Sequence, residues 1–243
     1  MSSLKLASLL HLLSFILLSK AAFGDDPLLH ICSSPDNFTT NDPFDKNLQQ
    51  LAGNLSNETP TNGFSLGSRG QGPYEVYGLA LCQVNVSYAD CWSCVATASK
   101  EIQNRCPNSK GATIWYEKCL FKYRNENFFG HLDLHGVGLC SPNSVSESIV
   151  SFNETKINLL SQLAKETLRS QNLYAVGSSE LNGGSDKLYG FTQCTRDISS
   201  LDCGVCLRFV FKKLSQYCDG KDGGRISSGS CSVRYEMYEF LNA

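Results

Sequence analysis

Beyond its first two dozen residues, the chain of 243 residues lacks any apolar run long enough to cross a membrane. A membrane-spanning helix needs about 20 consecutive apolar residues, so we expect no membrane anchor. The chain also lacks an excess of either charge, with 21 Lys and Arg against 23 Asp and Glu. Because the basic residues are few and scattered, we expect no nucleic-acid partner.

Motifs of the common catalytic sites are missing as well: the sequence contains no G-x-S-x-G, no P-loop and no G-x-G-x-x-G. Histidine is scarce, and beyond residue 24 the chain has only His30, His131 and His135. His131 and His135 are four residues apart but lack the Glu of a zinc-protease motif and a third ligand. We interpret them as part of a solvated linker and expect no enzymatic activity, no metal and no cofactor.

Residues 1–24 have the pattern of a secretory signal peptide. Lys5 precedes a short apolar run from Leu6 to Leu18, and small residues lead to the acidic pair Asp25 and Asp26. We therefore expect an extracellular protein. In such a protein, Asn-x-Ser/Thr sequences are candidate glycosylation sites, and there are five: Asn37, Asn54, Asn57, Asn85 and Asn153.

Cysteine, in contrast, is abundant and regularly spaced. Five cysteines recur at a constant offset of 112 residues, and Cys32 and Cys140 precede the two sets. The sets are Cys82, Cys91, Cys94, Cys106 and Cys119, then Cys194, Cys203, Cys206, Cys218 and Cys231. This repeat predicts two tandem domains, at residues 25–131 and 140–243, joined by residues 132–139.

In an oxidising compartment, an even number of cysteines at matched spacings indicates structural disulfides. A zinc site built from the two C-x-x-C pairs would join distant halves and leave eight cysteines unexplained. A redox-active C-x-x-C pair needs an exposed thiolate of low pKa, while each repeat offers four further cysteines as partners. We therefore favour disulfides over both alternatives.

Each repeat predicts a helix around its C-x-x-C pair. Ser87 and Asp90, like Ser199 and Asp202, form an S-x-x-D capping box directly before it. The apolar positions that follow are spaced to form one buried stripe on each helix. They are Cys94, Ala98, Ile102 and Cys106 in the first repeat, and Cys206, Val210, Leu214 and Cys218 in the second. We also assign Phe209 and Tyr217 to the core.

An earlier helix and flanking strands complete each repeat. The earlier helices are marked by Phe44, Leu48, Leu51 and Leu55, and by Ile157, Leu160, Ala164 and Leu168. Strand-like stretches are 74–82, 114–123, 187–194 and 225–240. Two helices on one antiparallel sheet give an α+β layer that buries one face of each element.

The spacing C-x8-C-x2-C followed by C-x12-C resembles the plant cysteine-rich secretory repeat, also called the ginkbilobin-homologous domain. The resemblance covers nearly the whole chain beyond residue 24 as two tandem copies. It implies a fold of two helices on a five-stranded antiparallel sheet, in a free secreted member of the family. It also implies the disulfides Cys32–Cys106, Cys82–Cys91, Cys94–Cys119, Cys140–Cys218, Cys194–Cys203 and Cys206–Cys231, which the spacing alone does not select.

The resemblance further implies a candidate mannose site. Family members of the lectin type bind mannose through an Asn after the first cysteine, an Arg and a Glu. In the second repeat these positions hold Ser141, Arg225 and Glu236, so two of the three match. A guanidinium and a carboxylate can together hydrogen-bond neighbouring sugar hydroxyls. Arg225 and Glu236 can equally form an ordinary ion pair.

The equivalent positions of the first repeat, Ser33, Thr113 and Arg124, match none of the three.

Two functional hypotheses remain. The first is a secreted defence protein with lectin-like binding of mannose-type glycans and an antifungal role. The second is an extracellular protein-interaction module that contacts receptor ectodomains or copies of itself without binding sugar. A thiol oxidoreductase is a third, and it requires a reactive thiol pair.

Overall fold

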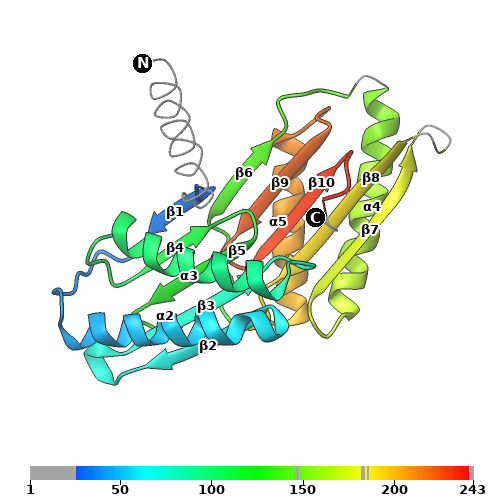
Figure 1. Cartoon of the computed structure of the whole chain (residues 1–243). Coiled ribbons are helices and arrows are strands. Elements are labelled where there is room, and N and C mark those ends of the chain that lie inside the picture. The colour runs from blue at the N-terminus through cyan, green and yellow to red at the C-terminus, as the bar shows by residue number, and fades with distance from the viewer. Residues whose placement is uncertain (1–25, 146–147, 182–183, 185, 241–243) are drawn as a thin grey trace, which may run out of the picture.

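The structure is a computed structural model that describes residues 26–145, 148–181, 184 and 186–240. The expected signal peptide lies outside these residues. Two domains follow one another along the chain, each with two helices and a five-stranded antiparallel sheet (Figure 1). The first comprises β1 (Leu29–Cys32), α2 (Pro43–Asn62), β2 (Phe64–Arg69), β3 (Val76–Cys82), α3 (Tyr88–Arg105), β4 (Ala112–Trp115) and β5 (Cys119–Arg124). The second comprises β6 (Gly136–Cys140), α4 (Ile149–Arg169), β7 (Tyr174–Leu181), β8 (Asp186–Cys194), α5 (Ser200–Tyr217), β9 (Gly223–Ser228) and β10 (Cys231–Glu236).

The two sheets have the same strand order. It is β1-β4-β5-β3-β2 in the first domain and β6-β9-β10-β8-β7 in the second. In each domain both helices cover the same face of the sheet, and the main hydrophobic core lies between helices and sheet. The α+β class expected from the sequence is therefore confirmed.

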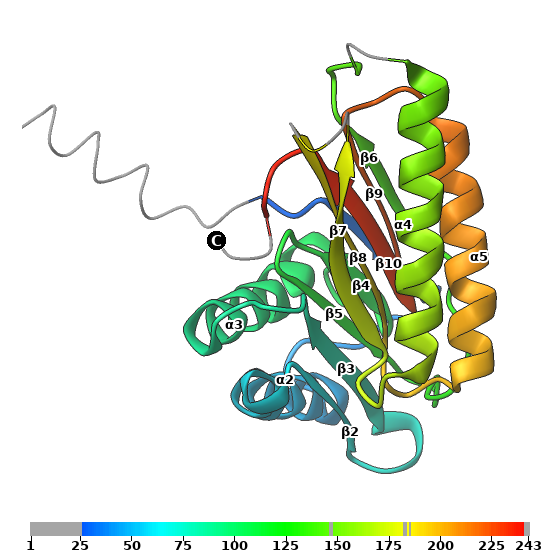
Figure 2. The ribbon, with the colours of Figure 1, turned by 90° about the vertical axis from the view of Figure 1, so that its right-hand side faces the viewer.

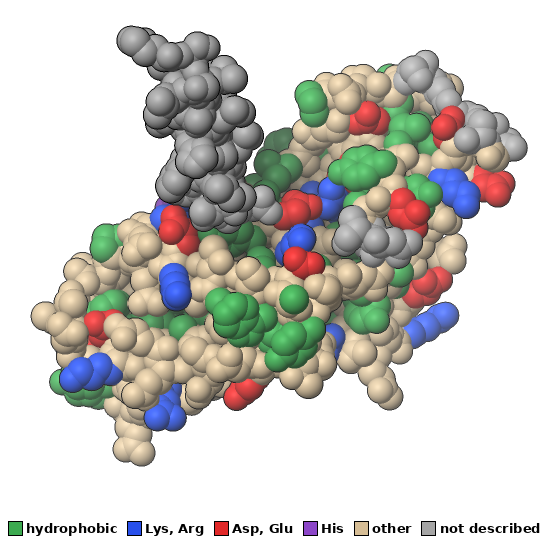
Figure 3. Space-filling model, in the orientation of Figure 1, with side chains coloured by type: hydrophobic (Ala, Val, Ile, Leu, Met, Phe, Trp, Pro, Cys, Tyr) green, Lys and Arg blue, Asp and Glu red, His purple; other side chains and the backbone are tan. Residues whose placement is uncertain are grey.

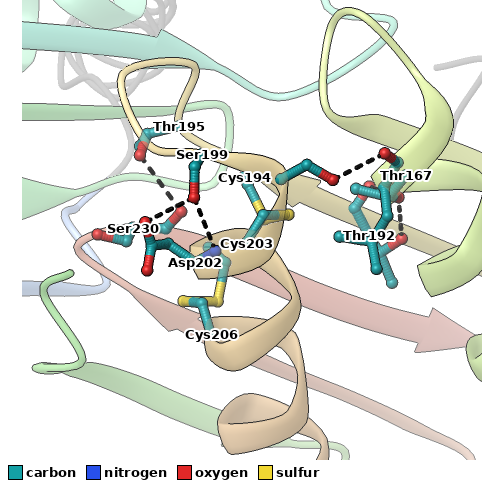
Figure 4. The surroundings of a disulfide bond; sticks show 12 residues. Thr167, Thr192, Cys194, Thr195, Ser199, Asp202, Cys203, Cys206 and Ser230 are labelled. Atoms are coloured by element: carbon teal, nitrogen blue, oxygen red, sulfur yellow. Dashed lines mark hydrogen bonds between the residues drawn. A yellow bond between two sulfur atoms is a disulfide. The ribbon is translucent and has the colours of Figure 1, made fainter. Parts of the chain in front are cut away.

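The predicted capping boxes begin both second helices. Ser87 accepts a hydrogen bond from the backbone N–H of Asp90, and Ser199 accepts one from Asp202. Each serine hydroxyl also donates to the carboxylate of its partner, at 2.8 and 2.6 Å. Figure 4 shows the second of these caps beside the Cys194–Cys203 disulfide, so the start of α5 is held both by its cap and by a covalent bond to β8.

The predicted helix stripes are mostly buried, with two corrections. Ile157 is 54% exposed, because the inner face of α4 is one residue out of phase with our prediction. That face comprises Phe152, Lys156, Leu159, Leu160, Leu163 and Thr167. Tyr217, which we assigned to the core, is 63% exposed at the end of α5, and Phe209 is half-buried.

Two of the predicted strand stretches are in fact hairpins. The stretch 114–123 contains β4, a turn and β5, and the stretch 225–240 contains β9 and β10. Both turns bring two strands into antiparallel register. The expected junction 132–139 is also partly ordered strand, because β6 begins at Gly136. The edge strands β1, β2, β6 and β7 are short or polar, and their pattern did not distinguish them from loops.

All twelve cysteines are paired in disulfides, three in each domain. Each pairing is the one that the family resemblance implied. In both domains one disulfide links the first strand to the end of the second helix, and the other two join that helix to neighbouring strands. The covalent network therefore fastens each second helix to its sheet at both ends.

The two domains pack through the faces of their sheets that carry no helices. Figure 2 shows α2 and α3 on one side of the molecule, α4 and α5 on the other, and the sheets between them. The Trp115 indole donates to the carbonyl of Ser228 at 3.1 Å, and the Gln193 amide donates to the carbonyl of Cys82 at 3.0 Å. Apolar side chains, including Leu81 and Leu120, fill the space around Trp115. The inner faces of both sheets are thus largely used for contact between the domains.

Candidate functional site

The three residues expected to hold mannose lie on neighbouring strands at the inner face of the second sheet. Arg225 is on β9, Glu236 is on β10, and Ser141 directly follows β6. Gly223 of β9 lies between Glu236 and Ser141. It pairs with Glu236, and its carbonyl accepts from the Ser141 N–H at 2.9 Å. The fold therefore brings the three positions to one face.

The guanidinium of Arg225 is, however, buried against the first domain. Arg225 is 6% exposed. Its two terminal nitrogens donate to Glu117 at 2.8 Å, to the Glu117 carbonyl at 3.1 Å and to the Gln83 side-chain carbonyl. Burial outweighs the attraction of Glu117 and lowers the pKa of Arg225 to about 10, so the side chain is still charged at neutral pH. This arginine is a bridge between the domains.

Glu236 also has a protein partner. Its carboxylate accepts from the Nε of Arg234 at 2.8 Å, and Arg234 in turn donates to Glu117. Burial raises the pKa of Glu236 despite the opposing effect of Arg234. Glu117 thus receives the guanidinium groups of Arg225 and Arg234 together, and the four charges form one network across the domain boundary.

Little space remains beside Arg225 for a sugar. The cavity beside Arg225 has a volume of about 40 Å³ and is lined by residues of both domains, including Gln83, Trp115 and Phe191. Such a volume holds about one water molecule. The Nε of Arg225 has no hydrogen-bond partner within the described residues, which fits a water there. The Ser141 hydroxyl accepts from the Asn143 N–H at 3.2 Å.

The equivalent face of the first domain carries a second polar cluster. Asp133 is buried and receives Lys122 at 2.7 Å and Arg124 at 3.2 Å. The backbone N–H of Asp133 donates to the Ser230 hydroxyl of the second domain. Thr113 is buried, at 2% exposure. His131 and His135 are exposed, as expected, but the segment between them is anchored by Asp133.

Sequence reasoning did not find Glu117, Gln83 or Asp133. Glu117 lies in the turn between β4 and β5, which we predicted as continuous strand, and Asp133 lies in the predicted junction. None of them belongs to a motif. Their role comes from the packing of one domain on the other, which the sequence pattern of a single repeat does not report.

The candidate glycosylation sites are on the surface, with one partial exception. Asn37, Asn54, Asn57 and Asn85 are exposed. Asn153 is half-buried, and its side-chain nitrogen donates to Asp219 at 2.8 Å. Asn54 and Asn57 both lie on α2, three residues apart.

Charged groups are scattered on the face shown in Figure 3, where Lys and Arg alternate with Asp and Glu and form no continuous basic area. Within the described residues, no helix is both long and apolar enough to cross a membrane.

Comparison with known proteins gives consistent results for both domains. The model of the salt stress response/antifungal family matches residues 31–126 and again residues 139–238. An antimicrobial ginkbilobin-2-like protein of Castanea crenata is 44% identical over 233 residues, which cover 95% of this chain and 96% of the relative. A cysteine-rich repeat secretory protein of Arabidopsis thaliana is 42% identical over 88% of this chain and 85% of its own length.

A solved structure with the same architecture is the tandem DUF26 ectodomain of a cysteine-rich receptor-like protein from Arabidopsis thaliana. It is 27% identical and superposes with a TM-score of 0.76, covering 89% of this chain and all of that ectodomain. The likeness extends over both domains.

Proposed function

The chain belongs to the salt stress response/antifungal family of secreted cysteine-rich proteins, and from this premise we propose that it is a non-enzymatic defence protein that recognises its target by protein contact rather than by binding mannose. The defence role follows from the antimicrobial relative, which matches almost the entire chain. The mode of recognition is a separate step, and it rests on one side chain.

The observation that carries this step is the position of Arg225. A mannose site needs a guanidinium that is free to donate to sugar hydroxyls, whereas this one is 6% exposed and already bound to Glu117 and Gln83. A sugar hydroxyl would still accept a charge-assisted bond from the guanidinium, but it would not replace the negative charge of Glu117, so the ion-pair attraction would be lost. Of the three positions of the family sugar site, the one held by Arg225 here fastens the domains together.

Lectin-like binding of mannose-type glycans is the competing hypothesis, and it makes a structural demand. It requires the domains to move apart at Glu117 so that Arg225, Glu236 and Ser141 become accessible together. Such an opening would separate Arg225 from Glu117 and expose the apolar contacts around Trp115 to water, so it is unfavourable without a ligand that compensates for both losses.

Calorimetric titration of mannose and short mannans into the secreted, disulfide-intact protein tests the proposal. We expect no saturable heat from the protein or from its Arg225→Ala/Glu236→Ala variant. Saturable heat that the variant loses while keeping its melting temperature would establish the lectin hypothesis and contradict ours. A Glu236→Gln variant, which keeps the shape of the side chain, guards against loss of binding through unfolding.

A growth assay tests the defence role separately. We expect the protein to inhibit fungal hyphae equally well with and without an excess of soluble mannan. Relief of inhibition by mannan would again favour the lectin hypothesis. Unimpaired growth over the whole concentration range would contradict the antifungal role itself.

A further inference from the structure

A groove lies between the edge strand β6 and helix α5 of the second domain. Its volume is about 350 Å³. Phe209, Lys213 and Tyr217 of α5 form one wall, and Ile226 of β9 forms part of the floor. Gly136 and Gly138 of β6 form the opposite rim. It lies on the helix-covered side of the sheet, away from the network of Arg225 and Glu117.

The groove exists because two of the β6 residues on the face turned to α5 are glycines. Side chains alternate along a strand, so Gly136, Gly138 and Cys140 share the face that is turned to α5. Cys140 is joined to Cys218 at the end of that helix. A Cβ on Gly138 would lie 2.8 Å from the terminal carbon of Ile226, so the glycine leaves room that any other residue would occupy.

The first repeat has no equivalent arrangement in its sequence. When Cys32 is aligned with Cys140, Leu28 and His30 correspond to the two glycines of β6. On its helix, Thr97 replaces Phe209, and Glu101 pairs with Arg105 at 2.7 Å where α5 has Lys213 and Tyr217. The groove is therefore a property of the second repeat and not of the shared fold.

The outer edge of β6 offers unpaired backbone groups. Among the described strands, β6 pairs with β9 alone and ends the sheet (Figure 1). At the two ends of this pairing, the backbone hydrogen bonds to the β9 side are made by His135 and Ser141. Because every second residue of a strand bonds to the same neighbour, Gly136 and Gly138 direct their N–H and C=O to the outer edge. Such an edge is a template for one more strand.

Lys213 supplies the charge of the groove. Its ammonium lies 5.7 Å from the ring centre of Phe209 and 5.6 Å from that of Tyr217. Across the part of the chain that the structure describes, no carboxylate forms an ion pair with it. A ligand that carries an acidic group beside an apolar one would complement this wall.

We propose that β6 and this groove bind an extended segment of a partner protein, which adds a strand to the sheet and carries an acidic and an apolar side chain two residues apart. Both side chains would point toward α5, the apolar one against Phe209 and Tyr217 and the acidic one toward Lys213. The proposal gives the protein-binding function a location, and it rests on that function.

A second copy of this chain is a poorer occupant. If β6 paired antiparallel with its own copy about Gly138, the two α5 helices would lie on the same face of the joined sheet. Lys213 would then approach Lys213 of the copy, and neither would gain a carboxylate. Like charges placed together disfavour that arrangement.

Selection from a displayed library of random ten-residue peptides on the intact secreted protein tests the site. We expect enriched peptides with an acidic and an apolar residue at positions i and i+2. They should bind Lys213→Glu and Tyr217→Ala about tenfold or more weakly. The matched control is Lys212→Glu, which makes the same charge change on an exposed neighbour of α5 and should leave binding unchanged.

A second measurement probes the backbone pairing without changing the protein. In an added strand, alternate amides face β6, so N-methylation at one set of alternate positions should abolish peptide binding while the other set is tolerated. Equal tolerance of both sets would overturn the strand addition.

The failures of the two proposals are distinguishable. Enriched peptides that bind Lys213→Glu and Lys212→Glu equally would overturn the groove and leave the protein-binding function standing. A library with no enrichment, together with saturable heat from mannosides, would overturn both.

Discussion

The ammonium of Lys122 lies 2.7 Å from the carboxylate of Asp133, and both side chains are buried. The same carboxylate receives Arg124, and the Asp133 backbone holds Ser230 of the second domain. Burial alone raises the pKa of Asp133, but the charge of Lys122 and the hydrogen bonds from Lys122 and His135 outweigh it and lower the pKa to about 2. The segment that joins the two domains is thus fixed by an ionised aspartate.

Asp133→Asn should therefore lower the free energy of unfolding by about 2 kcal/mol at neutral pH, as the shift from 3.8 to about 2 implies. Because the folded pKa lies below the unfolded one, this stabilisation is complete above about pH 4 and is lost as the pH falls toward 2. Urea unfolding at pH 6, 4, 3 and 2 would measure the difference between protein and variant. A difference that did not shrink with falling pH would contradict the assignment, and exposed Asp36→Asn is the control.

Glu117→Ala should leave Arg225 buried without its carboxylate. We expect a loss of about 1–3 kcal/mol, moderated because the Glu117 side chain is 42% exposed. Adding Arg225→Met should restore much of the loss, since an apolar side chain of similar length does not need a counter-charge. Thermal unfolding of both variants would decide this. A double variant that is less stable than Glu117→Ala alone would show that Arg225 contributes chiefly through contacts other than Glu117.

The sequence predicted the parts of this molecule that repeat and missed those that arise between the repeats. The spacing of Cys82, Cys91 and Cys94 recurs in the second half, and both capping boxes stand at the same place, so these local signals reinforce one another. Glu117 and Asp133 carry no such signal. Their function depends on which face of one sheet meets the other, and two identical folds can be arranged in several ways.

The α4 helix shows a subtler limit. Its sequence has apolar residues at both Ile157 and Leu159, so two overlapping stripes fit the helical period about equally well. The structure selects the stripe that includes Leu159 and Leu163, and Gly177 and Gly190 on the neighbouring strands let these leucines approach the sheet. The glycines that admit them are distant in sequence, and the helix pattern alone does not contain that information.

This correction can be measured directly. Ile157→Ala should change the free energy of unfolding by less than about 0.5 kcal/mol, because the side chain is 54% exposed. Leu160→Ala, which truncates a side chain at 4% exposure one turn along, should cost about 2–5 kcal/mol. Chemical denaturation of both variants compares the two positions on the same helix. Equal losses would mean that α4 sits in the register we first predicted.

The disulfides should differ in their contributions according to the loops they close. Cys140–Cys218 spans 78 residues and Cys194–Cys203 spans 9, within one domain. If the bonds act by restricting the unfolded chain, replacing the first pair with alanines should cost about 2 kcal/mol more than replacing the second. Both bonds join α5 to a strand, which makes them a matched pair. Calorimetry of the two paired variants, each kept fully oxidised at its other cysteines, would test this. A larger loss from Cys194–Cys203 would place its contribution in the folded state, where it holds the capped start of α5 against β8, and would contradict the loop-entropy account for this domain.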